Sequence, residues 1–289
     1  MNKMDMPYVV GVDVGGQTTK IGVVDMRGQV LAQTVIRTDT YGEVDPYIDE
    51  LAEAINKVIA DAGVTGQVRG IGMGIPNGNY YTGEIENAVN LKWGNKGIIP
   101  VANLLKEKMN GVPVALTNDA NAAAIAEAKI GAGRNFKSVY YITVSTGIGG
   151  GFVLNGDIVK GASGYAGEAG SILIRKENKD SFGSKLFPGS IECYASGNAI
   201  TRRGSSVTGK SLKDAGEVFK AAKNGELWGI ALVDQMAYDL AMMCADISYI
   251  VNPQIFVFGG GCMTIDNPFF DKMCKNYYEI VDEGLHNII

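Results

Sequence analysis

The sequence predicts an α/β protein built from two similar domains. Apolar, strand-like segments alternate with segments of helical spacing along the chain. The order strand, glycine-rich turn, strand, turn, strand begins at residue 8 and begins again at residue 138. At roughly 150 residues per domain, the 289 residues are enough for two domains. We therefore expect two α/β domains related by duplication, over residues 1–117 and 118–289.

The first half contains five strand-like segments and two segments of helical spacing. Strands are expected at residues 8–14, 19–25, 29–38, 68–76 and 112–118. Helices are expected at residues 44–63 and 101–111. The longer helix has the clearest pattern, because Ile48, Leu51 and Ile55 share one face and Gly63 follows as a stop.

The second half repeats this arrangement and then adds helices. Strands are expected at residues 138–147, 150–156, 157–161 and 253–261. A single long helical stretch is expected over residues 215–252, with another helix after the last strand. The resemblance between the halves lies in the order of the elements and not in identical residues.

Composition and charge exclude several classes of protein. The net charge of −5 argues against a nucleic-acid-binding protein, which would show a basic face. The sequence has neither the apolar core of a signal peptide at its start nor a run of ~18 apolar residues that would span a membrane. The four cysteines form no C-x-x-C pair and His286 is the only histidine, so no structural zinc is expected. Reduced thiols would suit a cytoplasmic protein.

Three strands end in glycine-rich turns, which suit the binding of phosphate. They are Asp13-Val14-Gly15-Gly16-Gln17-Thr18, Thr146-Gly147-Ile148-Gly149-Gly150-Gly151 and Gly259-Gly260-Gly261. Glycine lets backbone N–H groups approach a phosphate closely and can take a positive φ. Asp13 stands inside an apolar strand, so we expect its carboxylate to be buried and to need a partner or a metal. Because it precedes the first turn, it would hold Mg²⁺ through water. Neither the Walker loop nor the Rossmann pattern is present, so the phosphate site would be of another kind.

The segment "VALTNDANAAAIAE" (114–127) runs from an apolar strand into an alanine-rich helix. Asn118 and Asp119 stand at the junction, and both residue types commonly cap helices. Asp119 is therefore either a cap or a carboxylate placed for chemistry. The two roles can also be divided, with Asn118 capping the helix and Asp119 reaching a binding site.

Several motifs together resemble the ROK family of bacterial sugar kinases and sugar-responsive repressors. "GVDVGGQTTKIGVVD" is similar to the first phosphate motif of the wider hexokinase and actin superfamily. "NLKW", "VALTNDANAAAIAE", "STGIGGGFVLNGDIVKGASGYAGEAG" and "GSIECYASG" follow in the order that the ROK family shows. The match runs from about residue 8 to about residue 262, and the middle motifs are specific to the family.

The resemblance implies two actin-like (ribonuclease H-like) domains with ATP and a sugar bound in the cleft between them. Asp119 matches the family's catalytic base. The residues that match sugar contacts are Asn90, Asn118, Asp119, Glu168 and Glu192, with Ser171 beside them. The residues that match the ATP site are Asp13, Gly15, Gly16, Gln17, Thr18, Thr146, Gly147, Gly149, Gly259 and Gly260. A hexose such as glucose or an N-acetylated relative would be the substrate, ATP the phosphate donor and Mg²⁺ its metal ion.

The chain departs from the family pattern around the sugar site. The family's E-x-G-H is here Glu168-Ala169-Gly170-Ser171, so a serine replaces the histidine that touches the sugar and binds zinc. The zinc segment C-x-C-G-x-x-G-C is replaced by residues 175–190, with Ser190 in the place of the last cysteine. With no zinc there, we expect Phe182, Leu186 and Phe187 to support the loop that carries Glu192.

Two further departures concern the ends of the pattern. Gln17 stands where the family has threonine, although Thr18 follows and supplies a hydroxyl. The family's closing strand and helix have no counterpart after residue 289, so either the second domain lacks them or the given chain is shortened.

Two functions fit these motifs. The first is an ATP-dependent hexose kinase, a homodimer by the family's pattern. The second is a sugar-sensing regulator with weak or no kinase activity. The family's repressors carry a DNA-binding domain before the first phosphate motif, and here that motif begins at about residue 8. We therefore expect sugar and ATP as partners, without nucleic acid or membrane. Most glutamates are solvated surface residues, and Glu168 and Glu192 could be the same. Their glycine-rich settings favour a pocket instead.

Overall fold

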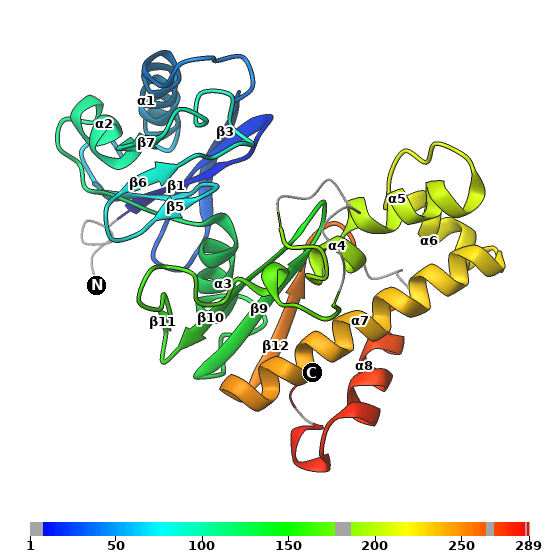
Figure 1. Ribbon diagram of the computed structural model, residues 1–289. Helices are drawn as coiled ribbons and strands as arrows, with labels where there is room; N and C mark the ends of the chain where they lie inside the picture. Colours follow the sequence, from blue (N-terminus) through cyan, green and yellow to red (C-terminus); the bar gives the residue numbers. More distant parts are fainter. Residues whose placement is uncertain (1–7, 177–185, 264–268, 287, 289) are drawn as a thin grey trace. The chain divides into compact units, whose positions relative to one another are not determined.

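The computed structural model describes residues 8–176, 186–263, 269–286 and 288 (Figure 1). The chain divides into two compact units, Met1–Ala123 and Ala124–Ile289. The division falls inside one helix, α3 (Asp119–Lys129). Each unit has its own sheet and its own buried core. The predicted α/β class is therefore confirmed for both halves.

The first unit is built on a five-stranded mixed sheet. Its strands are β1 (Tyr8–Val14), β2 (Thr18–Val24), β3 (Val30–Arg37), β4 (Val68–Gly74) and β8 (Val114–Thr117). They lie in the order β3-β2-β1-β4-β8. The first three strands pair antiparallel, whereas β4 is parallel to both β1 and β8. These strands lie where the sequence predicts them, within a few residues.

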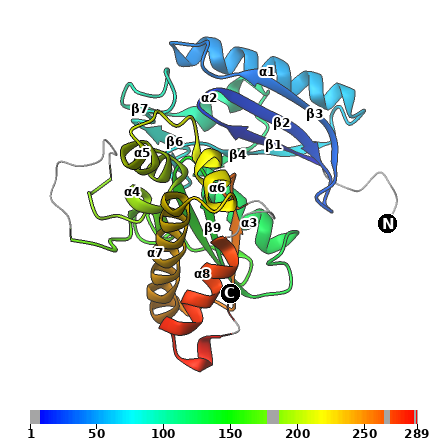
Figure 2. The same cartoon turned by 90° about the vertical axis from the view of Figure 1, so that its right-hand side faces the viewer.

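Two helices cover this sheet. They are α1 (Val44–Asp61) and α2 (Val101–Lys108). Figure 2 shows α1 lying across one face of the sheet. Its predicted apolar face is buried, since Leu51 and Ile55 have no exposed surface. Burial of each such side chain contributes about 1.5–3 kcal/mol to stability. This contribution stabilises a helix that would be only marginally stable in isolation.

Residues between β4 and α2 form a small second sheet that the sequence pattern did not predict. Its strands are β5 (Gly78–Asn79), β6 (Glu84–Glu86) and β7 (Ile98–Ile99). The strands are too short to show a period of two. Trp93, between β6 and β7, is fully buried and stacks on Tyr47 of α1 with ring centroids 4.5 Å apart. This contact attaches the small sheet to the core of the unit.

The second unit repeats the arrangement of the first four strands. Its strands are β9 (Ser138–Val144), β10 (Ile148–Leu154), β11 (Asp157–Ile158) and β12 (Ile255–Gly259). They lie in the order β11-β10-β9-β12, with β12 parallel to β9 and the other pairs antiparallel. The first unit has the same pattern in β3-β2-β1-β4. The repeated order of elements in the sequence therefore corresponds to a repeated topology.

The helices of the second unit differ from the sequence prediction. They are η2 (Ala169–Ser171), α4 (Glu192–Ala195), α5 (Gly197–Thr208), α6 (Ala215–Lys223), α7 (Leu227–Val251), α8 (Phe269–Ile280) and η3 (Glu283–Leu285). A single helix over 215–252 is wrong, because residues 224–226 separate α6 from α7. Gly225 takes φ +81° there, which ends a helix readily. The sequence prediction also missed α4 and α5.

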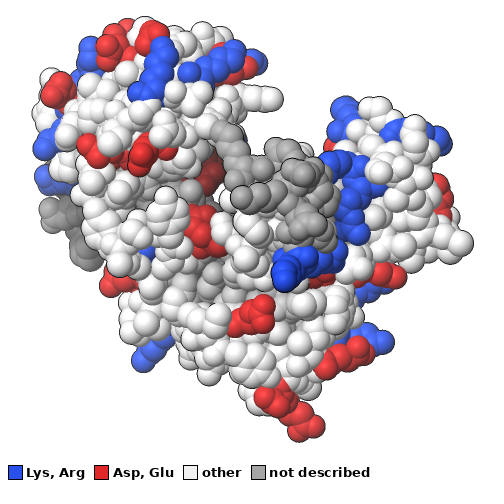
Figure 3. All heavy atoms as spheres, viewed as in Figure 1, with Lys and Arg blue, Asp and Glu red and all other residues white. Residues whose placement is uncertain are grey.

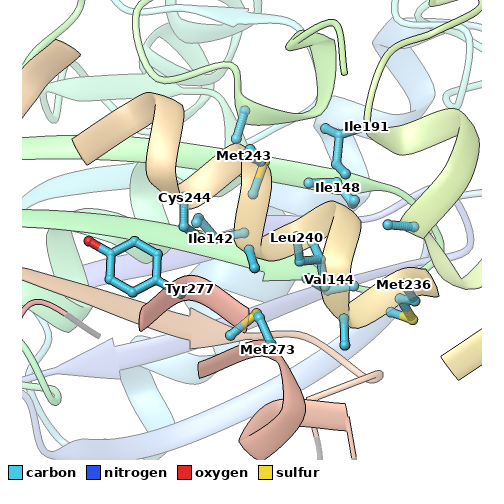
Figure 4. Packing of buried hydrophobic residues seen from close by; sticks show 14 of the residues in the cluster. Ile142, Val144, Ile148, Ile191, Met236, Leu240, Met243, Cys244, Met273 and Tyr277 are labelled. Carbon is cyan, nitrogen blue, oxygen red and sulfur yellow. The ribbon is translucent and has the colours of Figure 1, made fainter. Parts of the chain in front are cut away.

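The core of the second unit lies between its sheet and the long helix α7. Ile142 and Val144 of β9 face Leu240 and Met243 of α7 in Figure 4, and all four are fully buried. α8 packs against α7, with Tyr277 donating or accepting a hydrogen bond with Ser248 at 2.8 Å. The sheet and the two helices thus form a layered support for the turns described below.

The surface carries charges of both signs, and the cysteines are reduced. Figure 3 shows acidic and basic side chains on both units, and the net charge is −5. Among the described residues, no helix has the length and apolar character needed to cross a membrane. All four cysteines are free thiols.

Candidate active site

The parallel strands of the first unit bring two aspartates together at the carboxyl ends of the strands. Asp13 pairs in register with Gly74 of β4, and Gly74 pairs with Thr117 of β8. Parallel strands end at the same edge, so Asp13 and the residues that follow Thr117 lie together. Those residues are Asn118 and Asp119. Loops at the carboxyl ends of parallel strands are a common place for ligand sites in α/β proteins.

Asn118 and Asp119 both accept a hydrogen bond at the start of α3. The side-chain Oδ1 of Asn118 accepts a hydrogen bond from the backbone N–H of Ala120 at 2.9 Å, and its carbonyl accepts from Ala122. Asn118 therefore caps α3. Asp119 is the first residue of the helix, and its carboxylate also accepts from Ala120, at 2.9 Å. Its side chain has surface exposed to solvent.

The surroundings of Asp119 make its carboxyl a weaker acid than usual. Surrounding protein removes part of its hydration, and this raises its pKa, because the charged form loses most from the loss of water. The charge of Asp13 raises the pKa further, while the bond from Ala120 opposes the change. A raised pKa gives a carboxylate more affinity for a proton, which a general base needs.

Asp13 is exposed, whereas its place in an apolar strand suggested burial. Its side chain is 62% exposed, and its nearest cation is Lys20 at 3.8 Å on the neighbouring strand. β1 alternates between its two faces, and Asp13 falls on the solvated one. An exposed carboxylate fits the Mg²⁺ role, because Mg²⁺ keeps several waters and needs one or two protein carboxylates.

The first glycine turn is tight and lies against the loop that carries Asn90. The backbone N–H of Gly15 bonds to the carbonyl of Thr18 at 3.0 Å, which closes the turn. A Cβ on Gly16 would lie 2.8 Å from the carbonyl oxygen of Asn90. Close approach is therefore what requires glycine here, since neither Gly15 nor Gly16 has a positive φ. Gln17 and Asn90 are both exposed.

The second glycine turn is in direct contact with Glu192. The carboxylate of Glu192 accepts a hydrogen bond from the backbone N–H of Ile148 at 2.9 Å. A Cβ on Gly147 would lie 2.5 Å from the same carboxylate oxygen. Thr146 is exposed in the turn, but β10 begins at Ile148, so Gly149 lies in the strand and not in the turn.

The third glycine turn is packed against the second. Gly260 takes φ +97°, and a Cβ there would lie 2.4 Å from the carbonyl oxygen of Val144. A Cβ on Gly259 would lie 2.5 Å from the hydroxyl of Tyr141. Both positions therefore require glycine, one for its backbone angle and both for space. The turns come together because β9 and β12 are parallel neighbours.

A cavity of about 630 Å³ opens beside these two turns, within the second unit. It is lined by Ser145, Thr146, Gly197, Asn198, Thr201, Lys213, Asp214, Ala215, Gly216, Phe219, Lys220, Lys223, Gly261 and Cys262. Its size falls in the range of roughly 300–1,000 Å³ typical of small-molecule sites. The first residues of α5 and α6 and three lysines line it, and helix N-termini and lysines all attract anions.

Sequence reasoning predicted the turns but missed most of this cavity. The start of α6 at Ala215 was predicted, and the start of α5 could have been found, because Ser196 is a residue type that precedes helices. Ser196 does cap α5, accepting the N–H of Ala199 at 3.1 Å. The arrangement of Lys213, Lys220 and Lys223 around one space brings residues of α6 beside the turns at Thr146 and Gly261, which no local pattern predicts.

Glu168 and Ser171 lie at the two ends of the short helix η2. Glu168 precedes it and is half-buried, while Ser171 is its last residue and is exposed. A Cβ on Gly170 would lie 3.5 Å from the carboxylate of Glu192, so η2 and Glu192 are neighbours. Glu168 is also close enough to Tyr140 to contribute to the raised pKa of that phenol, after burial and Cys244.

The expected support for the Glu192 loop differs in the structure. Phe187 is 52% exposed and does not pack beneath the loop, Leu186 is half-buried, and Phe182 lies outside the described residues. Ser190 is fully buried instead, and its hydroxyl contacts the thiol of Cys193 at 3.3 Å. In the part of the chain that the structure describes, no group of His, Cys, Asp and Glu is arranged to hold a metal ion.

Comparison with known proteins identifies the family. The chain matches the family model described as the ROK family over residues 9–288. A glucokinase of Halalkalibacterium halodurans is 32% identical over 287 residues, covering 94% of this chain and 85% of that protein. A xylose repressor of Caldicellulosiruptor bescii is 25% identical, covering 93% of this chain and 69% of that protein. Relatives thus include both enzymes and a repressor.

Solved structures agree. A ROK hexokinase from Thermus thermophilus has a TM-score of 0.82 at 31% identity, covering 94% of this chain and 88% of that one. A ROK family glucokinase from Streptomyces griseus in complex with glucose and AMPPNP has a TM-score of 0.75 at 26% identity, covering 96% and 91%. These similarities confirm the predicted actin-like α/β class. With the family model matched over almost the whole chain, this protein belongs to the ROK family.

Proposed function

We propose that this protein is an ATP-dependent sugar kinase that phosphorylates a hexose, glucose or a related or N-acetylated hexose, with Asp119 as general base. One observation carries the proposal. Asp119 begins a helix at the carboxyl edge of β8, beside Asp13, with an accessible carboxylate whose pKa is raised. The names of the relatives, a glucokinase and a ROK hexokinase among them, support the same reaction class.

The chemistry asks little of the protein beyond position and charge. In phosphoryl transfer, the bond from the sugar oxygen to the γ-phosphorus forms while the bond to the leaving ADP oxygen breaks. The sugar hydroxyl loses its proton in the same process. Asp119 would accept a hydrogen bond from that hydroxyl, orient it, and take the proton. Its raised pKa favours this last step.

The sugar would be recognised by matched hydrogen bonds. Asn90, Asn118, Glu168, Ser171 and Glu192 are the candidate partners. The Oδ1 of Asn118 already accepts the N–H of Ala120, so its amide nitrogen is the group that would donate to a sugar hydroxyl. A site that bonds each hydroxyl rejects epimers strongly, because an unmatched polar group in the site is costly.

ATP would be bound mainly by the second unit. The cavity beside the second and third glycine turns has the size for a nucleoside, and its lysines and helix N-termini suit the phosphates. The transferred phosphate would be bound by the first glycine turn, which belongs to the first unit and contains Gly15, Gly16, Gln17 and Thr18. Asp13 would hold the Mg²⁺ of ATP through water, and the ion would supply positive charge that neutralises the phosphates.

A sugar panel tests the proposal. ADP release would be followed in a coupled assay with glucose, mannose, N-acetylglucosamine and N-acetylmannosamine, for the wild type and Asp119→Ala. We expect release that depends on one sugar and is lost in the variant. Asp61→Ala, an exposed change at the end of α1, is the matched control and should behave as wild type. Light scattering on the same sample would check the expected homodimer.

The alternative is a regulator that binds sugar without phosphorylating it. It has a relative in the xylose repressor. Thermal stabilisation by one sugar, with no ADP release in the wild type, would favour this alternative. Unchanged sugar phosphorylation in Asp119→Ala would instead remove Asp119 from its proposed role.

A further inference from the structure

The short helix α4, which begins at Glu192, has little stability of its own. It contains four residues, and a helix of that length does not persist without contacts to its surroundings. Its N-cap residue, Ile191, makes no side-chain cap bond. The direction of the Glu192 carboxylate must therefore be set by what holds α4 from outside.

One such group is a charged and aromatic cluster of Arg175, Tyr194 and Asp239. The Nη2 atom of Arg175 lies 2.5 and 2.7 Å from the two carboxylate oxygens of Asp239. The guanidinium of Arg175 also lies over the ring of Tyr194, 4.2 Å from its centroid. Tyr194 is a residue of α4, and Asp239 is in the middle of α7. Arg175 thus joins α4 to the long helix of the core.

Stability alone does not explain this cluster. Asp239 is 1% exposed, and burying a carboxylate costs more than it returns unless the charge is well paired. Its partners are Arg175 and the side-chain amide of Gln235, which donates at 2.9 Å. Apolar residues of similar size commonly match or exceed such a pair in stability. A buried pair of this kind is instead suited to fixing one geometry.

Two neighbouring arginines of α5 hold the backbone of the same short helix. Arg202 donates through Nη2 to the carbonyl of Cys193 at 2.9 Å, and Arg203 donates through Nη1 to the carbonyl of Tyr194 at 3.2 Å. Burial lowers the pKa of Arg203, and the charge of Asp239 acts in the opposite direction. Asp239 is therefore the anion that offsets the positive charges gathered around α4.

We propose that Asp239 and Arg175 are positioning residues for Glu192. They hold Tyr194, and through it α4, so that the Glu192 carboxylate stays on the N–H of Ile148 with its remaining oxygen sites directed to a sugar hydroxyl. The proposal deepens the kinase assignment and rests on it for the role of Glu192. It predicts that the cluster controls sugar affinity much more than nucleotide affinity or the rate of transfer.

The test uses a double variant that removes both charges together. Arg175→Met alone would leave Asp239 buried and unpaired, and the protein would risk not folding. Arg175→Met with Asp239→Leu replaces the pair by apolar side chains. The matched control is Lys272→Met with Asp234→Leu, which removes an exposed ion pair between α8 and α7. Arg175→Lys is a third variant, because it keeps the charge but loses the planar group over Tyr194.

Kinetics give the first measurement. We expect the double variant to raise the KM for sugar about tenfold or more, since small displacements of a positioning group cost this much. The KM for ATP and kcat should stay within about twofold, and the melting temperature within about 4 °C. Arg175→Lys should fall between wild type and double variant. The control pair should leave the KM for sugar unchanged.

Amide hydrogen exchange gives a second measurement that does not require turnover. Residues 192–195 and the N–H of Ile148 should exchange faster in the double variant than in the control, because local opening becomes easier. Wild-type exchange rates there, or faster exchange with an unchanged KM for sugar, would each overturn the positioning role. If the wild type releases no ADP with any sugar, the kinase proposal falls, and exchange at α4 alone decides whether the cluster holds that helix.

Discussion

The Glu192 carboxylate accepts a hydrogen bond from the backbone N–H of Ile148, at 2.9 Å, across 44 residues of the chain. Glu192 is a candidate sugar ligand, and Ile148 follows the turn that is a candidate for phosphate. One hydrogen bond therefore joins the candidate sugar ligand to a backbone group next to the candidate phosphate turn. This single contact makes the second glycine turn part of the proposed sugar site as well as of the proposed ATP site.

Gly147→Ala tests that connection. A methyl group there would lie 2.5 Å from the Glu192 carboxylate, so one of the two must move. We expect the KM for sugar and for ATP each to rise about tenfold, because both ligands would meet a displaced group. Steady-state kinetics with each substrate varied in turn measure this. Gly284→Ala is the control, since a Cβ there meets nothing within 4 Å. A rise confined to ATP would show that Glu192 is not a sugar ligand.

Asp119→Asn should separate catalysis from folding. Asparagine keeps an acceptor for the N–H of Ala120 but cannot take a proton. Turnover should fall by about 10²-fold or more, which is the scale of a lost general base. The melting temperature at pH 7 should equal or exceed that of the wild type. Calorimetry beside the coupled assay gives both values, and a clear loss of stability would contradict the environment described for Asp119.

The difference in stability between Asp119→Asn and the wild type should depend on pH. The folded pKa of Asp119 is raised, so the ionised side chain is less favourable in the folded state than in the unfolded one. Protonated Asp119 contributes its full share to the free energy of unfolding below the pKa that it has in the unfolded chain. This contribution is lost as the pH rises through the higher pKa that Asp119 has in the folded protein. The stability difference between Asp119→Asn and wild type should therefore appear above that pH and shrink as the pH falls.

The acid limb of the rate profile should depend on Asp13. Only the ionised form of Asp119 can act as base, so kcat/KM should fall as pH drops through its raised pKa. In Asp13→Asn the neighbouring charge is gone, and the limb should move to lower pH although the overall rate decreases. Desolvation, the larger cause of the raised pKa of Asp119, remains in this variant. A limb at the same pH in both proteins would show that the two carboxylates are not coupled.

Gly260→Ala should destabilise the second unit. The residue has φ +97°, and a Cβ would lie 2.4 Å from the carbonyl of Val144. Strain of this kind costs about 1–3 kcal/mol. Urea unfolding would measure the loss. Gly261→Ala is a closely matched control, because its Cβ would meet only the hydroxyl of Ser145 at 3.7 Å. Equal stability of the two variants would argue against the tight packing of the third turn.

Lys220→Ala should weaken ATP binding selectively. Lys220 lines the cavity of the second unit with Lys213 and Lys223. Loss of one cation near phosphates should raise the KM for ATP about three- to tenfold, and less at high salt, because screening weakens the attraction. The KM for sugar should not change. Lys275→Ala, which removes an exposed ion pair with Glu279 on α8, is the control. An unchanged KM for ATP would place the triphosphate elsewhere.

The strands and the long helix α1 could be predicted from the sequence, because their periodic burial follows directly from the apolar pattern. The small sheet β5-β6-β7 could not, since two or three residues show no period. The break between α6 and α7 was missed because apolar side chains continue on both sides of it, although Asn224-Gly225 is a sequence signal for a turn. Asp13 was read as buried because sequence alone does not say which face of a strand is solvated.

The candidate site divides in the same way. The turn glycines, Asn118 and Asp119 could be singled out from the sequence because each belongs to a local motif. The cavity and the Arg175–Asp239 pair depend on residues distant in sequence, 64 positions apart in the latter case, and no local pattern predicts such a contact. The roles of the individual site residues remain predictions for the experiments above.

The stacking of Trp93 on Tyr47 also gives the protein a built-in optical probe. The chain has two tryptophans, Trp93 in the first unit and Trp228 in the second. Trp93 is fully buried, three positions after Asn90, whereas Trp228 is half-buried and donates to Glu226 at 2.8 Å. Their emission should differ in colour, with Trp93 the bluer. A Trp228→Phe protein would report on sugar and a Trp93→Phe protein on nucleotide, each by its own fluorescence.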